Sequence, residues 1–141
     1  CNGPVNGTCA ICGLGEDANH VFFKCCLAIF AWSAVRDTFK QNWNPQNSLD
    51  LLSLLTAQRG ANARVVWRCV GALFWSIWTV RNKITIEHKF PAHPAEILFK
   101  CHIFLQAWAP LGKQRDEGRM NEVLEQIKAC TTRARLQDPP D

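Results

Sequence analysis

The chain has 141 residues, which is enough for one domain or for one small domain with a helical extension. Hydrophobic residues make up 48% of it and charged residues 20%, which excludes an intrinsically disordered chain. The formal net charge of +4 permits contact with nucleic acid but does not by itself require it. No apolar stretch reaches the roughly 18 residues of a membrane span, because Arg68 and Arg81 bound the longest one.

The chain contains eight cysteines, and their setting favours a reducing environment. It begins Cys1-Asn-Gly-Pro-Val without an initiator methionine or a signal peptide, which we interpret as the start of a fragment. Cys69, Cys101 and Cys130 fall singly inside helix-like patterns, where buried free thiols act as small hydrophobic side chains. We therefore expect an intracellular protein, in the nucleus or the cytoplasm, rather than a secreted disulfide framework.

The most specific motif lies near the N-terminus, where Cys9, Cys12, His20 and Cys25 are spaced C-x2-C-x7-H-x4-C. Two cysteines separated by two residues and followed by a glycine form a tight knuckle with both thiolates directed at one ion. A histidine and a third cysteine complete a Cys3His site, the usual arrangement for structural zinc. Because such a site has no open coordination position, we expect structural Zn²⁺ and no hydrolytic chemistry.

Spacing alone leaves the fourth ligand open, because Cys25 and Cys26 are adjacent and Cys1 also competes. On an ideal α-helix, His20 and Cys25 would point roughly 140° apart. We therefore place His20 on the lead-in to the first helix and Cys25 in its first turn. There the positive end of the helix dipole favours a thiolate.

Apolar periodicity predicts a mostly α-helical chain with about five helices and no convincing strand. Asn47 or Ser48 is the predicted N-cap of the second helix and Asn62 that of the third. Ile84-Thr85-Ile86 is a candidate for a short extended piece at the end of the third helix. The predicted helices cover residues 23–40, 49–60, 63–87, 94–110 and 116–130.

The chain divides into three predicted segments. Residues 1–45 hold the zinc-binding knuckle and the first helix, 46–112 a helical Trp-rich region, and 113–141 a charged C-terminal helix with a disordered tail. Trp67, Trp75 and Trp78 widen the apolar arc of the third helix, and we expect core packing for them rather than a nucleic-acid stacking platform. The clearest core stripe of that helix is Val66, Val70, Leu73, Phe74 and Ile77, with Val80 or Ile84, and the last helix has the narrow seam Met120, Val123, Leu124 and Ile127.

Residues 64–89 form the most basic section, with five Lys or Arg residues against Glu87 alone. On one interpretation, the third helix simply emerges into solvent here. On the other, the section forms an edge that contacts nucleic-acid phosphates. The candidate nucleic-acid-binding residues are Arg64, Arg68, Arg81, Lys83 and Lys89, whereas His88, His93 and His102 lack ligand spacing and are expected to be surface or capping groups.

The sequence contains no catalytic constellation. It lacks the paired-aspartate turn of a polymerase, a glycine-rich phosphate loop, and a nucleophile with a plausible base. We therefore expect a non-enzymatic chain without a small-molecule substrate.

Two runs carry a resemblance to a known family. Cys9-x2-Cys12-Gly13, Glu16 and His20-Val-Phe-Phe-x-Cys25, with Ala28 and Trp32 following, resemble the zinc-binding domain found after the reverse transcriptase of plant LINE-type (non-LTR) retrotransposons. The run Phe74-Trp75-Ser-Ile-Trp78-Thr-Val-Arg81-Asn82-Lys83 resembles the W-x-x-W-x-x-R-N-K run that lies downstream in the same proteins. The resemblance is specific over residues 9–39, good over 66–89 and loose beyond, and the family's Trp-containing lead-in before the first cysteine is absent.

The resemblance implies that Cys25 is the fourth zinc ligand. It also implies an accessory region of a retrotransposon polyprotein whose RNA-directed DNA polymerase lies outside this chain. The implied partners are RNA or DNA and the upstream reverse transcriptase domains, with no membrane. Two alternatives stay open: a helical protein–protein scaffolding module that packs on those upstream domains, and a non-functional retroelement remnant.

Overall fold

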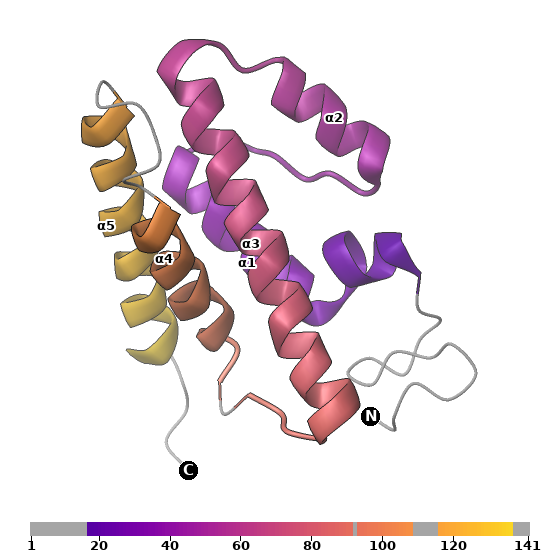
Figure 1. Ribbon diagram of the computed structural model, residues 1–141. Helices are drawn as coiled ribbons and strands as arrows, with labels where there is room; N and C mark the ends of the chain where they lie inside the picture. Colours follow the sequence, from indigo (N-terminus) through magenta and orange to yellow (C-terminus); the bar gives the residue numbers. More distant parts are fainter. Residues whose placement is uncertain (1–16, 92, 109–115, 137–141) are drawn as a thin grey trace.

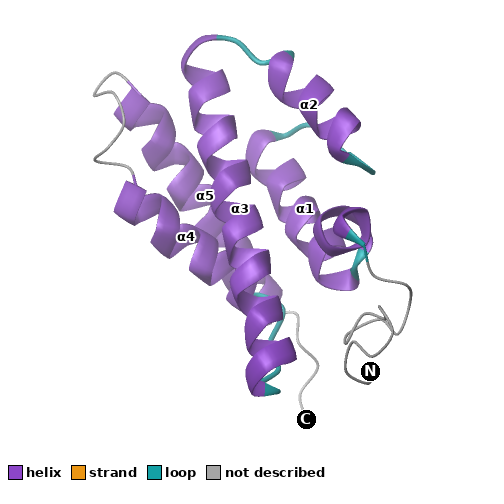
Figure 2. Cartoon of the chain, turned by 45° about the vertical axis from the view of Figure 1, so that its right-hand side comes forward, coloured by secondary structure: helices purple, strands orange, loops and turns teal. Residues whose placement is uncertain are grey.

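The computed structural model describes residues 17–91, 93–108 and 116–136, and these ranges contain six helices and no strand (Figures 1 and 2). The expectation of a mostly helical chain is therefore confirmed over these ranges, while Cys9 and Cys12 of the predicted knuckle lie outside them. The elements, in chain order, are the π-helical turn η2 (His20–Lys24), α1 (Cys26–Phe39), α2 (Ser48–Thr56), α3 (Gly60–Glu87), α4 (Glu96–Trp108) and α5 (Glu117–Leu136).

Local chemistry accounts for several helix ends. The side chain of Asn47 accepts a hydrogen bond from the backbone N–H of Asp50 at 2.9 Å, so Asn47 is the cap of α2 among the two predicted candidates, Asn47 and Ser48. Lys40 ends α1 and His88 ends α3 in the left-handed conformation, with φ of 54° and 57°. The N–H of each donates back to a carbonyl of the last turn, as in a left-handed C-cap.

Three predicted details are wrong. Asn62 does not cap α3, because that helix begins two residues earlier, at Gly60, whose φ of +64° suits a glycine. Ile84-Thr85-Ile86 is helical rather than extended, since α3 continues to Glu87. Helix α5 continues past the predicted end at Cys130 to Leu136.

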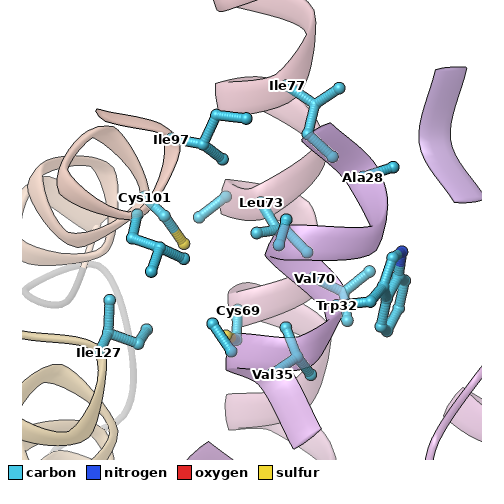
Figure 3. Close-up of a cluster of buried hydrophobic side chains, with 14 of the residues drawn as sticks. Ala28, Trp32, Val35, Cys69, Val70, Leu73, Ile77, Ile97, Cys101 and Ile127 are labelled. Atoms are coloured by element: carbon cyan, nitrogen blue, oxygen red, sulfur yellow. The ribbon is translucent and has the colours of Figure 1, made fainter. Parts of the chain in front are cut away.

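Helix α3 lies at the centre of the molecule and contacts every other helix (Figure 1). Its predicted stripe forms the middle of the core, with Val66, Val70, Leu73, Ile77, Val80 and Ile84 all buried. Figure 3 shows side chains of α3 between those of α1 on one side and those of α4 and α5 on the other. One cluster of buried hydrophobic residues thus joins all three predicted segments, and the division into segments stays a prediction.

Helix α5 covers α1 and α4 with the narrow seam predicted for it, since Met120, Val123 and Ile127 are buried. Cys69, Cys101 and Cys130 are free thiols buried inside helices, as expected. A hydrogen bond with Cys69, together with burial, raises the pKa of the Cys101 thiol. Of the helices described, none combines the length and the apolar character needed to cross a membrane.

Candidate functional site: a candidate metal-binding turn and two surface patches

The two described residues of the predicted zinc site, His20 and Cys25, lie at the two ends of one wide turn. His20 opens η2, and Cys25 is the extended N-cap of α1, with φ −62° and ψ 149°. The backbone N–H of Cys25 donates to the carbonyl oxygen of His20 at 2.7 Å, the five-residue closure of a π-turn. The predicted first helix therefore splits here, and Cys25 precedes the first turn of α1 rather than lying within it.

Both side chains are withdrawn from solvent. His20 is 6% exposed, and its Nε2 has no hydrogen-bond partner among the described residues. Buried polar atoms in proteins normally have a partner, and a bound metal ion is one group that would satisfy this nitrogen. Cys25 is fully buried whereas its neighbour Cys26 is exposed, which favours Cys25 where spacing did not distinguish the two.

These two donors fit a structural zinc ion. An unpartnered imidazole nitrogen and a buried thiol, joined by one turn, are nitrogen and sulfur ligands of the kind that zinc prefers. Within residues 17–91, 93–108 and 116–136 no group of three or more His, Cys, Asp or Glu residues gathers, and Cys9 and Cys12 lie outside these ranges. The four-ligand set therefore stays a prediction, of which His20 and Cys25 are the described half.

Two aromatic contacts fix the turn that carries His20. The indole Nε1–H of Trp32, on α1, donates to the carbonyl oxygen of Phe22 at 2.9 Å. The ring of Phe22 also stacks on that of Phe74, on α3, with centroids 4.7 Å apart. The turn is thus attached to both α1 and α3. These contacts hold it in place, so a metal ion that binds there would have less conformational entropy to overcome.

Arg81 lies inside the molecule, not on the basic edge where the sequence placed it. Only 6% of the residue is exposed, and its Nη1 donates to Cys25 Sγ at 3.5 Å. The expected position at a solvent edge is corrected because α3 packs this face against η2 and does not present it to solvent. The predicted basic edge therefore divides between a buried side and an exposed side of α3.

The other four basic residues differ in their surroundings. Arg64 forms a two-pronged ion pair with buried Asp116, at 2.6 and 2.7 Å, and so ties the start of α3 to the start of α5. Arg68 is half-buried, whereas Lys83 and Lys89 are exposed. These two lysines border a hollow of about 190 Å³ beside Phe90, Pro91 and Glu96.

Half-buried Lys100 of α4 lies near Lys83, although no pattern in the sequence pointed to it. Burial lowers the pKa of its ammonium group, and the positive charge of nearby Lys83 lowers it further. The pairing depends on the packing of α4 against α3, which a linear pattern does not reveal. We call Lys83, Lys89 and Lys100 the lysine cluster.

The tryptophans divide between the core and the surface. Trp32 is 2% exposed, as expected for a core residue. Trp67, Trp75 and Trp78 are 50%, 51% and 49% exposed, so the expectation of core packing is wrong for these three. They lie at positions 67, 75 and 78, on the face of α3 opposite the buried stripe, with Gly71 between them.

An apolar hollow of about 490 Å³ opens on this face. Gly71 contributes no side chain to it, and a Cβ added there would meet no atom within 4 Å. Almost no polar atoms line it, so it suits flat or aliphatic apolar groups rather than ions. The residues that line it are Phe22, Gly71, Phe74, Trp75, Trp78 and Trp108.

No protein-family model, no curated protein and no solved structure matches this chain.

Proposed function

We propose that this chain is a structural zinc-binding, non-catalytic accessory module of a retrotransposon reverse-transcriptase-like protein, and that it assists nucleic-acid binding. The observation that carries the zinc part is the buried Nε2 of His20, which has no described partner and lies one π-turn from buried Cys25. The Cys3His spacing and the resemblance to the retrotransposon domain supply the other two ligands, Cys9 and Cys12. The ion would hold the N-terminal segment in shape and would take no part in a reaction.

Metal analysis tests the zinc site directly. Purified protein is expected to hold one zinc per chain, and a chelator is expected to lower its helical circular dichroism. Cys9→Ser, His20→Ala and Cys25→Ser should each reduce the zinc content. Cys26→Ser is the matched control, because this cysteine is exposed beside the site and should leave the zinc content unchanged. Full zinc content in the His20→Ala variant would refute the ligand assignment.

The nucleic-acid part is supported by the lysine cluster and by the exposed tryptophans. Positively charged side chains held near one another favour phosphate contact, and exposed indole rings provide surfaces on which bases stack. The residues that carry this part are Lys83, Lys89 and Lys100, with Trp75 and Trp78 as the stacking surface. Arg64 and Arg81 are no longer included, because their guanidinium groups bond to Asp116 and Cys25.

Binding of single-stranded RNA across a salt series tests this part. We expect affinity to fall with salt, and each phosphate contact that is lost to reduce the slope of log K against log salt by about 0.7. Lys83→Ala combined with Lys100→Ala should flatten the slope by about 0.7 to 1.4. Lys128→Ala is the control, since this exposed lysine lies on α5 outside the cluster. Binding that is insensitive to salt would contradict the proposal.

The apolar hollow favours a second candidate function, docking onto the upstream polymerase domains. Its lining offers almost no hydrogen-bond groups to bases, but it suits apolar side chains of a protein partner. Trp78→Ser distinguishes the two candidates. Base stacking on this ring predicts a loss of RNA affinity of about 1–3 kcal/mol, whereas docking predicts unchanged RNA affinity and lost binding to the reverse transcriptase domains. If the chain is a non-functional remnant, it should bind neither RNA nor the reverse transcriptase domains.

A further inference from the structure

Arg81 is a cation held inside the zinc-binding end of the molecule. It is 6% exposed, and its Nη1 lies 3.5 Å from Cys25 Sγ. A guanidinium group cannot shed its proton in a protein, and burying its charge is unfavourable unless a negative group lies beside it. A thiolate at Cys25 is such a group, and a metal ion is what holds a buried cysteine in that form.

The packing of α3 explains how Arg81 reaches Cys25 across 56 positions of sequence. Phe74 stacks on Phe22 of η2, and Arg81 follows Phe74 by seven residues, or about two helical turns. Residues at this spacing share one face of a helix. The face of α3 that packs against the π-turn therefore carries Arg81 to the thiol at the end of that turn.

We propose that Arg81 is a positioning residue of the zinc site, whose guanidinium group donates a hydrogen bond to the zinc-bound Cys25 thiolate and balances the charge of the site. This inference rests on the proposed zinc function. A zinc ion with three thiolates and one neutral imidazole carries a net charge of −1, which one arginine cancels. Hydrogen bonds from neighbouring groups orient such ligands and adjust how strongly they hold the metal. A charged donor to a thiolate is among the strongest of these bonds.

Two other roles for Arg81 make different predictions. A residue that binds RNA phosphate must be accessible, and Arg81 is not. A residue that only fills space in the core can be replaced by an apolar side chain of similar length without a specific effect on metal affinity. Charge balance instead predicts that the apolar replacement weakens zinc binding by more than any change in the stability of the metal-free protein explains.

The test compares Arg81→Met with the wild-type protein in zinc competition against a coloured chelator, and compares their urea unfolding without zinc. We expect zinc affinity to fall by about 10- to 100-fold, the usual effect of losing a hydrogen-bond donor to a ligand. Arg68→Met is the matched control, because Arg68 is half-buried on the same helix thirteen residues earlier, about 20 Å along its axis. Its zinc affinity should match that of the wild type.

The outcomes separate this inference from the zinc function itself. If the wild-type protein binds no zinc, the proposed function fails; if it binds zinc and Arg81→Met binds it equally well, only the role of Arg81 is overturned. If Arg81→Met does not fold, the test instead compares Arg81→Lys with the wild-type protein, both loaded with Co²⁺ in place of zinc. Replacing the guanidinium group weakens its hydrogen bond to sulfur, so the thiolate-to-cobalt charge-transfer band should move to lower energy. An unchanged band would overturn the role of Arg81.

Discussion

Trp32→Phe is expected to destabilise the protein, because Trp32 joins α1 to the turn that carries His20. The residue is 2% exposed, and its Nε1–H donates to the carbonyl oxygen of Phe22 at 2.9 Å. Leaving that carbonyl without this partner costs about 1–3 kcal/mol. The smaller phenyl ring leaves space beside Phe23 and Phe74, which adds about 1 kcal/mol. The expected loss is therefore about 2–4 kcal/mol in the free energy of unfolding.

Urea unfolding in zinc-saturated buffer measures this loss. With an m-value of about 2 kcal/mol/M, the midpoint should fall by about 1–2 M without a change in slope. Trp67→Phe is the matched control, since the same replacement at a residue that is 50% exposed should change stability by less than about 0.5 kcal/mol. Equal midpoint shifts for the two variants would refute the claim that the Trp32 hydrogen bond and its burial stabilise this end of the fold.

Three further predictions concern the helical body. Asn47→Ala should lower stability by about 1 kcal/mol in urea unfolding, because the cap of α2 is lost; no change would show that α2 does not depend on it. Asp116→Asn should lower the urea midpoint, because the buried partner of Arg64 loses its charge; an unchanged midpoint would contradict a stabilising role for this pair. Burial and the charge of Lys128 lower the pKa of His102, so the unfolded chain binds the proton more readily and stability should fall as pH drops below about 6.5. His102→Gln should reduce that loss, and an identical pH profile would exclude His102 as its source.

The helices and most of the core follow from local patterns in the sequence. The buried stripe of α3 repeats at helical spacing, so Val66, Val70, Leu73 and Ile77 were predicted to be core residues and are buried. The cap at Asn47 is also a local feature, because a capping side chain bonds to a backbone group only three residues away. The zinc-ligand spacing is equally local, and its chemistry remains a prediction that metal analysis will decide.

Tertiary packing decided the surroundings of the charged and aromatic side chains. Arg64, Arg81 and Lys83 look alike in a basic run, but one pairs with Asp116, one is buried against Cys25, and one is exposed beside Lys100. Each difference depends on which helix packs against that face of α3, and those contacts join residues far apart in the chain. Helical periodicity reports which face of one helix is apolar and says nothing about how much of it the neighbouring helices cover.

The same limit applies to the tryptophans and to the turn that carries His20 and Cys25. The apolar arc of α3 is wider than the surface that the neighbouring helices cover. Trp75 and Trp78 lie on the uncovered part and remain half exposed, whereas Trp32 of α1 is buried. The sequence by itself determined the helices, the buried stripe and the spacing of the candidate ligands, because these depend on neighbours a few residues apart. Only the tertiary structure decided that Cys25 rather than Cys26 turns inward and that Arg81 meets it there, because both follow from the packing of α3 against the π-turn.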